Sequence, residues 1–138
     1  MSISYFHDKT ISSQQFIDLL KRSTLAERRP VDKADVIAGM LANADILITA
    51  WQGEQLVGVA RSVSDFTYCC YLSDLAVDQN YQHLGIGKTL QQETLSRIGA
   101  QCTLILLAAP KAHDYYKKIG FSAHPRCWVL APGEKLKP

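Results

Sequence analysis

The segment with the clearest chemical pattern is Gln82-His-Leu-Gly-Ile-Gly-Lys88, which joins an expected strand to an expected helix. The start of a helix leaves several N–H groups without intrahelical partners, and the helix dipole favours negative charge there. Gly85 and Gly87 lack the Cβ atoms that would hold a phosphate away from those N–H groups. Lys88 adds a cation nearby. The pattern predicts a cradle for a pyrophosphate group.

Two better-known phosphate loops are excluded by the same residues. The pattern G-x-x-x-x-G-K-[ST] is absent, so this is not a Walker loop. A dinucleotide fingerprint would need a third glycine at position 90, which is Leu90. A simple turn remains the alternative interpretation of a glycine pair at a helix start.

The elements that must position this loop follow from the apolar periodicity. The pattern predicts helices at residues 12–22, 32–44, 85–98 and 112–119, and Ser12 and Gln15 can form a capping box for the first of them. It predicts strands at residues 3–6, 46–51, 55–63, 70–77, 103–108 and 127–130. Residues 103–108 are almost continuously apolar, which is typical of a strand buried on both faces. The order β-α-α-β-β-β-α-β-α-β indicates a mixed α/β fold.

Bulk properties narrow the class of protein. The 138 residues fit one domain, residues 1–138, and 47% are hydrophobic. The net charge of +2 is too small to favour nucleic acid or an anionic membrane as a partner. The apolar stretch at residues 103–110 is far shorter than the ~20 residues that span a bilayer. The four cysteines form no C-x-x-C pair, and no residues have metal-ligand spacing, so we expect a cytoplasmic protein with reduced cysteines and no metal.

Two motifs together carry a resemblance to a known family. Gln82–Gly87 fits the pattern [Q/R]-x-x-G-x-[G/A], and the preceding Tyr71–Val77 is similar to the strand before that loop. Asp114–Phe121 is similar to the pattern F-Y-x-K-x-G-F. The sequence thus resembles the GNAT superfamily of acetyl-CoA-dependent N-acetyltransferases over nearly its whole length, with the N-terminal half similar only in pattern. Gln82 stands where many members carry arginine, and no residue clearly matches the glutamate that serves many members as a general base.

The resemblance implies a central, mostly antiparallel sheet flanked by helices, with acetyl-CoA bound between the strand that ends at Val77 and the strand that ends at Ala108. The pantetheine arm would pair with the backbone of Leu75 and Val77, and a strand N–H would stabilise the oxyanion. The residues expected to bind acetyl-CoA are Leu75, Ala76, Val77, Gln82, His83, Leu84, Gly85, Ile86, Gly87 and Lys88.

The resemblance also implies catalytic and acceptor-binding residues. Tyr116 lies four residues before Gly120, where the family's tyrosine stands, and is the candidate acid that protonates the departing thiolate; a role as a core aromatic is the alternative. Asp74 is a candidate base, with an outward-facing strand charge or a helix partner as the alternative. Arg28 and Arg29 lie between the first two helices, which border the acceptor site in this family, and would contact an acidic acceptor, unless they form only a solvated basic turn.

We therefore expect an N-acetyltransferase that moves the acetyl group of acetyl-CoA to a primary amine of a small molecule. The alternatives are a protein lysine or N-terminal acetyltransferase, and an acetyl-CoA-binding module without activity. The expected partners are acetyl-CoA and an amine acceptor, with no nucleic acid or membrane, in a monomer or a homodimer.

Overall fold

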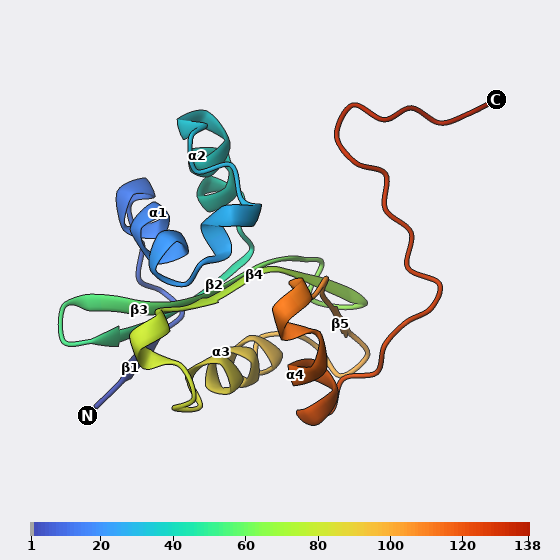
Figure 1. Ribbon diagram of the computed structural model, residues 1–138. Coiled ribbons are helices and arrows are strands. Elements are labelled where there is room, and N and C mark those ends of the chain that lie inside the picture. The colour runs from blue at the N-terminus through green and yellow to red at the C-terminus, as the bar shows by residue number, and fades with distance from the viewer. Residues whose placement is uncertain (1) are drawn as a thin grey trace. The chain divides into compact units, whose positions relative to one another are not determined.

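The computed structural model describes residues 2–138 and contains two compact units, one that extends to Leu107 and one that begins at Ala108 (Figure 1). We call them the N-terminal unit and the C-terminal unit and describe each by itself. The expected single domain over residues 1–138 stays a prediction.

The N-terminal unit is built on a five-stranded sheet in the order β1-β2-β3-β4-β5. Neighbouring strands are antiparallel except β4 and β5, which are parallel. This mostly antiparallel sheet confirms the predicted fold class. The strands are β1 (Ser4–Phe6), β2 (Ile46–Gln52), β3 (Gln55–Ser64), β4 (Cys69–Val77) and β5 (Thr103–Ile105).

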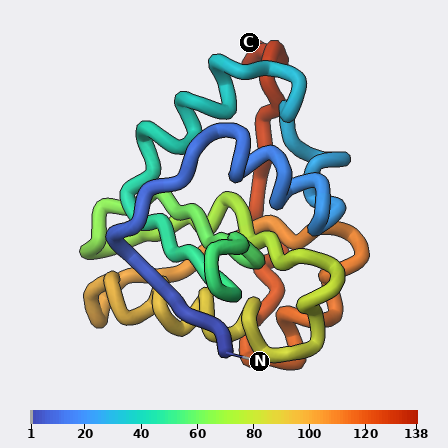
Figure 2. Tube along the Cα trace, turned by 90° about the vertical axis from the view of Figure 1, so that its left-hand side faces the viewer, coloured from blue at the N-terminus to red at the C-terminus, as the bar shows by residue number. Residues whose placement is uncertain are grey.

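Helices cover both faces of the sheet. Helices α1 (Ser13–Arg22) and α2 (Ala34–Ala42) lie on one face, and α3 (Ile86–Leu95) lies on the other (Figure 2). Short 3₁₀ turns η1 (Leu25–Arg28) and η2 (Gln79–Tyr81) connect these elements. The predicted capping box is confirmed, because the Ser12 side chain accepts from the Gln15 N–H and the Gln15 side chain accepts from the Ser12 N–H.

Each face of the sheet has its own apolar core. On the face of α1 and α2, the buried cluster comprises Phe16, Leu19, Leu20, Ile37, Trp51, Leu56, Val59 and Ala76. On the face of α3, it comprises Ile46, Ile48, Ala50, Val57, Ala60, Cys70, Leu72, Ile86 and Leu90. Because both faces are covered, β3 is buried over most of its length and gives an almost unbroken apolar run.

An irregularity in β4 decides which of its side chains face which helices. Arg61 pairs with Asp74 and Ser62 pairs with Leu72, so Ser73 is the extra residue of a β-bulge. Before the bulge Leu72 belongs to the core beneath α3, and after it Ala76 belongs to the core beneath α1 and α2. The bulge therefore places Asp74 on the face of α1 and α2.

The prediction for residues 103–108 is wrong in extent and in burial. Strand β5 ends at Ile105, and its residues are half-buried or exposed. The ladder with β4 runs only from Cys69/Thr103 to Tyr71/Ile105. Among the described strands β5 has β4 as its one neighbour, so it is a sheet edge and not a central strand.

The C-terminal unit contains η3 (Pro110–Ala112) and α4 (His113–Lys118). Gly120 ends α4 with a φ of 109°, and its N–H donates to the Lys117 carbonyl while the Phe121 N–H donates to the Tyr116 carbonyl. This is a Schellman termination, as the glycine predicts. The strand expected at residues 127–130 is absent: this segment pairs with no strand among residues 2–138, and Trp128 is 90% exposed.

Candidate functional site

The glycine turn between β4 and α3 has the backbone geometry of an anion cradle. Gly85 is the N-cap of α3 with a φ of 81°, and His83 also has a positive φ, of 65°. The first intrahelical bond runs from the Thr89 N–H to the Gly85 carbonyl, so the preceding N–H groups of the first turn have no intrahelical acceptor. Such N–H groups, together with the helix dipole, favour a bound phosphate.

Glycine at position 85 allows a positive φ and leaves the N–H groups of the helix start accessible to a ligand. A Cβ atom at Gly85 would meet no other atom within 4 Å, so close packing does not require the glycine. The positive φ does require it, because other residues rarely adopt that conformation. The space beside Gly85 is open to a ligand, which is the condition for a phosphate to reach the N–H groups.

Two polar side chains of the expected cradle, those of Gln82 and Lys88, have different roles in the structure. The Gln82 Nε2 donates to the Val77 carbonyl over 3.2 Å, so Gln82 ties the loop to the end of β4. Lys88 is exposed on the first turn of α3. Lys88 is therefore the side-chain cation of this turn that a bound anion can reach.

The last residues of β4 present an open backbone edge. The Asp78 N–H donates to the Val57 carbonyl over 2.9 Å, which directs the backbone groups at this position toward β3. Because these directions alternate along an antiparallel strand, the groups of Val77 and Leu75 point to the other edge. The ladder with β5 has already ended at Tyr71, so no described strand covers this edge; apart from the Val77 carbonyl, which accepts from Gln82, its groups can pair with an extended ligand.

Asp74 lies at the centre of a charged network. It is fully buried, and its Oδ1 and Oδ2 accept from the Nε of Arg29 and the Nε of Arg61, respectively. Arg29 also donates to the Ser73 carbonyl over 2.7 Å, and Arg61 donates to the Ser73 hydroxyl over 2.9 Å. An enclosed carboxylate held by two guanidinium groups is poorly placed to collect a proton from a substrate. This geometry favours a positioning role for Asp74 over a role as a base.

The two arginines expected at the acceptor site differ in their surroundings. Arg29 is partly buried and turned toward β4. Arg28, at the end of η1, is exposed and forms no ion pair within residues 2–138. Only Arg29 is therefore held in a defined orientation.

Tyr116 lies on α4 in the C-terminal unit. Its ring packs edge-on against Tyr115, with centroids 5.2 Å apart, and against Phe121, with centroids 5.4 Å apart. Burial, with a smaller contribution from Tyr115, raises the pKa of the Tyr116 hydroxyl to about 12. Tyr116 therefore keeps its proton at neutral pH. Its catalytic role stays a prediction.

Sequence reasoning missed Arg61 and the ion pair of Arg22 with Asp78. Arg61 interrupts a strand that is otherwise buried, and a buried arginine requires an acidic partner, so the signal was present. The partner itself was not visible, because Asp74 is thirteen residues away. Asp78 pairs with Arg22 and caps η2 through the Asn80 N–H, which fixes the start of the glycine turn.

Two kinds of site are not found in the part of the chain that the structure describes. No group of three or more His, Cys, Asp or Glu side chains is arranged to hold a metal ion. No helix there is both long and apolar enough to cross a membrane.

The chain is similar over most of its length to known acetyltransferases. The family profile described as "Acetyltransferase (GNAT) domain" matches residues 9–127. The uncharacterized N-acetyltransferase ycf52 of Pyropia yezoensis is 29% identical over 131 residues, which cover 87% of this chain and 74% of that protein. The histone acetyltransferase TAP1 of Glycine max is 27% identical over 111 residues, which cover 71% of this chain and 47% of that protein. The chain belongs to the GNAT acetyltransferase family.

A solved structure shows the same fold. The protein SA2161 of methicillin-resistant Staphylococcus aureus superposes with a TM-score of 0.78 at 18% identity, covering 94% of this chain and 98% of that one. At this identity the likeness establishes the fold and leaves the substrate open.

Proposed function

We propose that this acetyltransferase moves the acetyl group of acetyl-CoA to the primary amine of a small molecule. One observation carries the choice of donor, and the amine acceptor follows from the family: the open edge of β4 leads directly into the glycine turn at the start of α3, within a single compact unit. A ligand with an extended amide-containing arm and a pyrophosphate at its end matches both features.

On this proposal the glycine turn binds the pyrophosphate, and the backbone groups of Leu75 and Val77 bind the pantetheine arm. Bound acetyl-CoA supplies the activated thioester. An N–H group of the β4 edge donates to the thioester carbonyl as its oxygen gains negative charge, which is the usual largest contribution to acyl transfer. Lys88 balances the charge of the phosphates.

The proposal keeps Tyr116 as the donor to the departing sulfur. A pKa of about 12 lies well above the pKa of about 8.5 of a free thiol, so complete proton transfer to a stable thiolate is uphill. A hydrogen bond from the Tyr116 hydroxyl nevertheless stabilises the charge that builds on sulfur. Water then completes the protonation. No residue is assigned as the base that deprotonates the amine, because Asp74 is enclosed by arginines.

The second candidate is acetylation of a protein lysine or N-terminus. It is favoured by the similarity to TAP1, which is named as a histone acetyltransferase. The two candidates differ in the size of the acceptor. A panel of small amines and lysine-containing peptides, assayed by release of free thiol from acetyl-CoA, separates them. Turnover confined to peptides would overturn the small-molecule proposal.

Binding of the donor has a separate test. Acetyl-CoA that binds only the folded protein, at ~100 times its Kd, adds about 2.7 kcal/mol to the free energy of unfolding. We expect thermal melting to show this stabilisation with acetyl-CoA and with CoA, and none with NADH as the control. A shift with NADH but not with acetyl-CoA would place a different nucleotide in the turn.

A further inference from the structure

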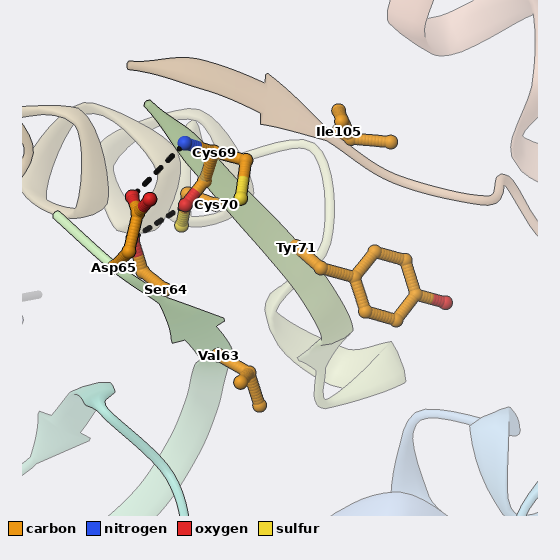
Figure 3. Close-up of a pocket in the computed structure, with 7 residues that line it drawn as sticks. All are labelled: Val63, Ser64, Asp65, Cys69, Cys70, Tyr71 and Ile105. Carbon is orange, nitrogen blue, oxygen red and sulfur yellow. Dashed lines mark hydrogen bonds between the residues drawn. The ribbon is translucent and has the colours of Figure 1, made fainter. Parts of the chain in front are cut away.

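Three apolar side chains from neighbouring strands form an uncovered row. Val63 pairs with Tyr71, and Tyr71 pairs with Ile105, so the three lie side by side across β3, β4 and β5. They are 47%, 40% and 45% exposed, respectively, and line one shallow pocket together with Ser64, Asp65, Cys69 and Cys70 (Figure 3). We call Val63, Tyr71 and Ile105 the apolar row.

The apolar row lies on the same face of the sheet as the charged network. Arg61 and Val63 are two residues apart on a regular stretch of β3, so their side chains share a face. Asp74 reaches that face through the bulge at Ser73, and pairs with Arg61. Two residues along a strand correspond to about 7 Å. The pocket and the network are therefore adjacent.

The network carries an excess of positive charge. Two guanidinium groups share one carboxylate, and the remaining ion pair of the described chain, Arg22–Asp78, is already complete. Each guanidinium has five N–H donors, of which Arg29 and Arg61 each direct three to protein acceptors. The side chain of Arg61 is only 7% exposed, whereas that of Arg29 is 21% exposed. Arg29 is thus the guanidinium group that an external anion can reach, and binding of that anion would neutralise the excess positive charge.

The network also lies at the right distance from the proposed donor site. Arg29 binds the Ser73 carbonyl, and Ser73 precedes Val77 by four residues, or about 13 Å of strand. A pantetheine arm that starts at the glycine turn and follows the edge of β4 brings its thioester toward Ser73. This step rests on the proposed function.

We propose that Arg29 and the apolar row form the acceptor subsite, and that it selects an amine carrying both a carboxylate and an apolar group, as an apolar α-amino acid does. Arg29 binds the carboxylate, and Val63, Tyr71 and Ile105 contact the apolar side chain. The neutral amine nitrogen forms a bond to the acetyl carbonyl carbon. The bond from that carbon to sulfur breaks, the sulfur leaves as the thiolate of CoA and takes up a proton, and the amine loses one.

Matched pairs of acceptors test the carboxylate. Phenylalanine and leucine are compared with phenethylamine and 3-methylbutylamine, which lack only the carboxylate, by thiol release at saturating acetyl-CoA. We expect kcat/KM to be at least tenfold higher for the amino acids, the scale of one charge-assisted hydrogen-bonded pair. Equal or higher values for the decarboxylated amines would overturn the proposal.

Variants then assign the effect to residues. In Arg29→Gln the higher kcat/KM of the amino acids over the decarboxylated amines should disappear, while the Kd for acetyl-CoA stays within twofold. Arg97→Gln removes an exposed cation on another part of the unit and is the charge-matched control.

Tyr71 is exposed, so Tyr71→Ala should leave the fold intact; kcat/KM should fall for phenylalanine and much less for glycine. Tyr68→Ala, 73% exposed in the turn before β4, is its control. If Arg29→Gln does not fold, the matched acceptor pairs and Tyr71→Ala still test whether this acceptor subsite exists.

Other outcomes are distinguishable. Thiol release with many amines but without any effect of Arg29 or Tyr71 leaves the proposed function intact and overturns the subsite. Absence of acetyl-CoA binding overturns the proposed function itself. Sedimentation tests a second copy of the chain as the occupant: a dimer that Tyr71→Ala dissociates, with unchanged acceptor preference, would assign the apolar row to a dimer interface instead.

Discussion

The stretch Ser73–Val77 in the second half of β4 has two ends that are built in different ways. At Val77 the strand runs into a turn whose recognition groups are backbone N–H groups, set by the positive φ of Gly85 and the start of α3. At Ser73 the strand carries a bulge, and the groups around it are side chains that arrive from β3 and from the segment after η1. The first end has N–H donors in the backbone, and the second has an excess of guanidinium donors around Asp74.

This difference indicates how each end can vary. A cradle of backbone groups depends on conformation, here on the positive φ of Gly85, and less on the identity of the other side chains, so it suits a ligand that never changes. A network of side chains depends on the residues themselves, so single substitutions can alter the ligand that it accepts. On our proposal the glycine end serves the acetyl donor and the bulge end serves the acceptor.

The largest expected effect belongs to neither end. In Tyr116→Phe the hydroxyl is lost while the ring contacts with Tyr115 and Phe121 remain. We expect kcat to fall by ~10²–10³-fold, the usual loss when one hydrogen-bond donor to developing negative charge is removed, with little change in the Kd for acetyl-CoA. Steady-state kinetics and calorimetric titration measure the two quantities. A normal kcat would remove Tyr116 from the mechanism.

The raised pKa of Tyr116 also predicts how the stability of the protein depends on pH. Its pKa is raised above the value of an unfolded tyrosine, so the stability linked to this group is present below about pH 10 and declines as the pH rises toward 12. Absorbance of tyrosinate in the wild type and in Tyr116→Phe should differ by one group that titrates near pH 12. Loss of a group that titrates near pH 10 would contradict the assignment.

The next effect compares the buried acids near the two ends, Asp74 and Asp78. Asp74→Asn leaves two arginines beside a neutral side chain, and removal of one partner from such a buried network costs about 3–5 kcal/mol. Asp78→Asn should cost less, about 1 kcal/mol, because its partner Arg22 is one-third exposed and regains water. Urea unfolding measures both. Equal losses would mean that the two ends do not differ in the energetics of their ion pairs.

A smaller effect is expected at the glycine end. Gly85→Val forces a β-branched residue into a left-handed conformation, and the turn should distort. We expect the affinity for acetyl-CoA and for CoA to fall by roughly tenfold, the loss of one charge-assisted hydrogen bond. Gly85→Asn is the control, because asparagine tolerates a positive φ, and it should retain most of the affinity. Unchanged binding to folded Gly85→Val would exclude this turn as the phosphate site.

The two ends also differ in how far sequence alone could predict them. The glycine turn is local: strand, glycines and helix follow one another within fourteen residues of Leu75–Lys88. The network at Ser73 joins Arg29 to Asp74 across 45 positions and depends on a bulge that no local pattern marks. The same limit applies to residues 127–130, where an apolar run predicts a strand that does not form. Whether a strand forms depends on pairing with a distant segment, which a local pattern does not reveal.

The smallest expected effect lies beneath the glycine turn, at Gln91. This side chain is 97% buried, with 3% exposed; its Nε2 donates to the Gly87 carbonyl over 3.2 Å, and its Oε1 has no hydrogen-bond partner among residues 2–138. A buried acceptor without a partner costs about 1–3 kcal/mol, and the bond to Gly87 returns about 0.5–1.5 kcal/mol. The unpaired oxygen therefore offsets much or all of what the bond to Gly87 contributes in the unliganded protein.

Gln91→Met removes both polar atoms and keeps an unbranched side chain of similar length, so packing should survive. We expect the free energy of unfolding to rise by up to about 1 kcal/mol in the absence of ligand. The melting shift caused by saturating acetyl-CoA shows whether the orphaned oxygen belongs to the donor site. If an amide N–H of the pantetheine arm pairs with Oε1, the shift should be smaller in Gln91→Met than in the wild type. An equal shift confines Gln91 to the core, and a destabilised Gln91→Met would show that the bond to Gly87 outweighs the orphaned oxygen at the glycine end of β4.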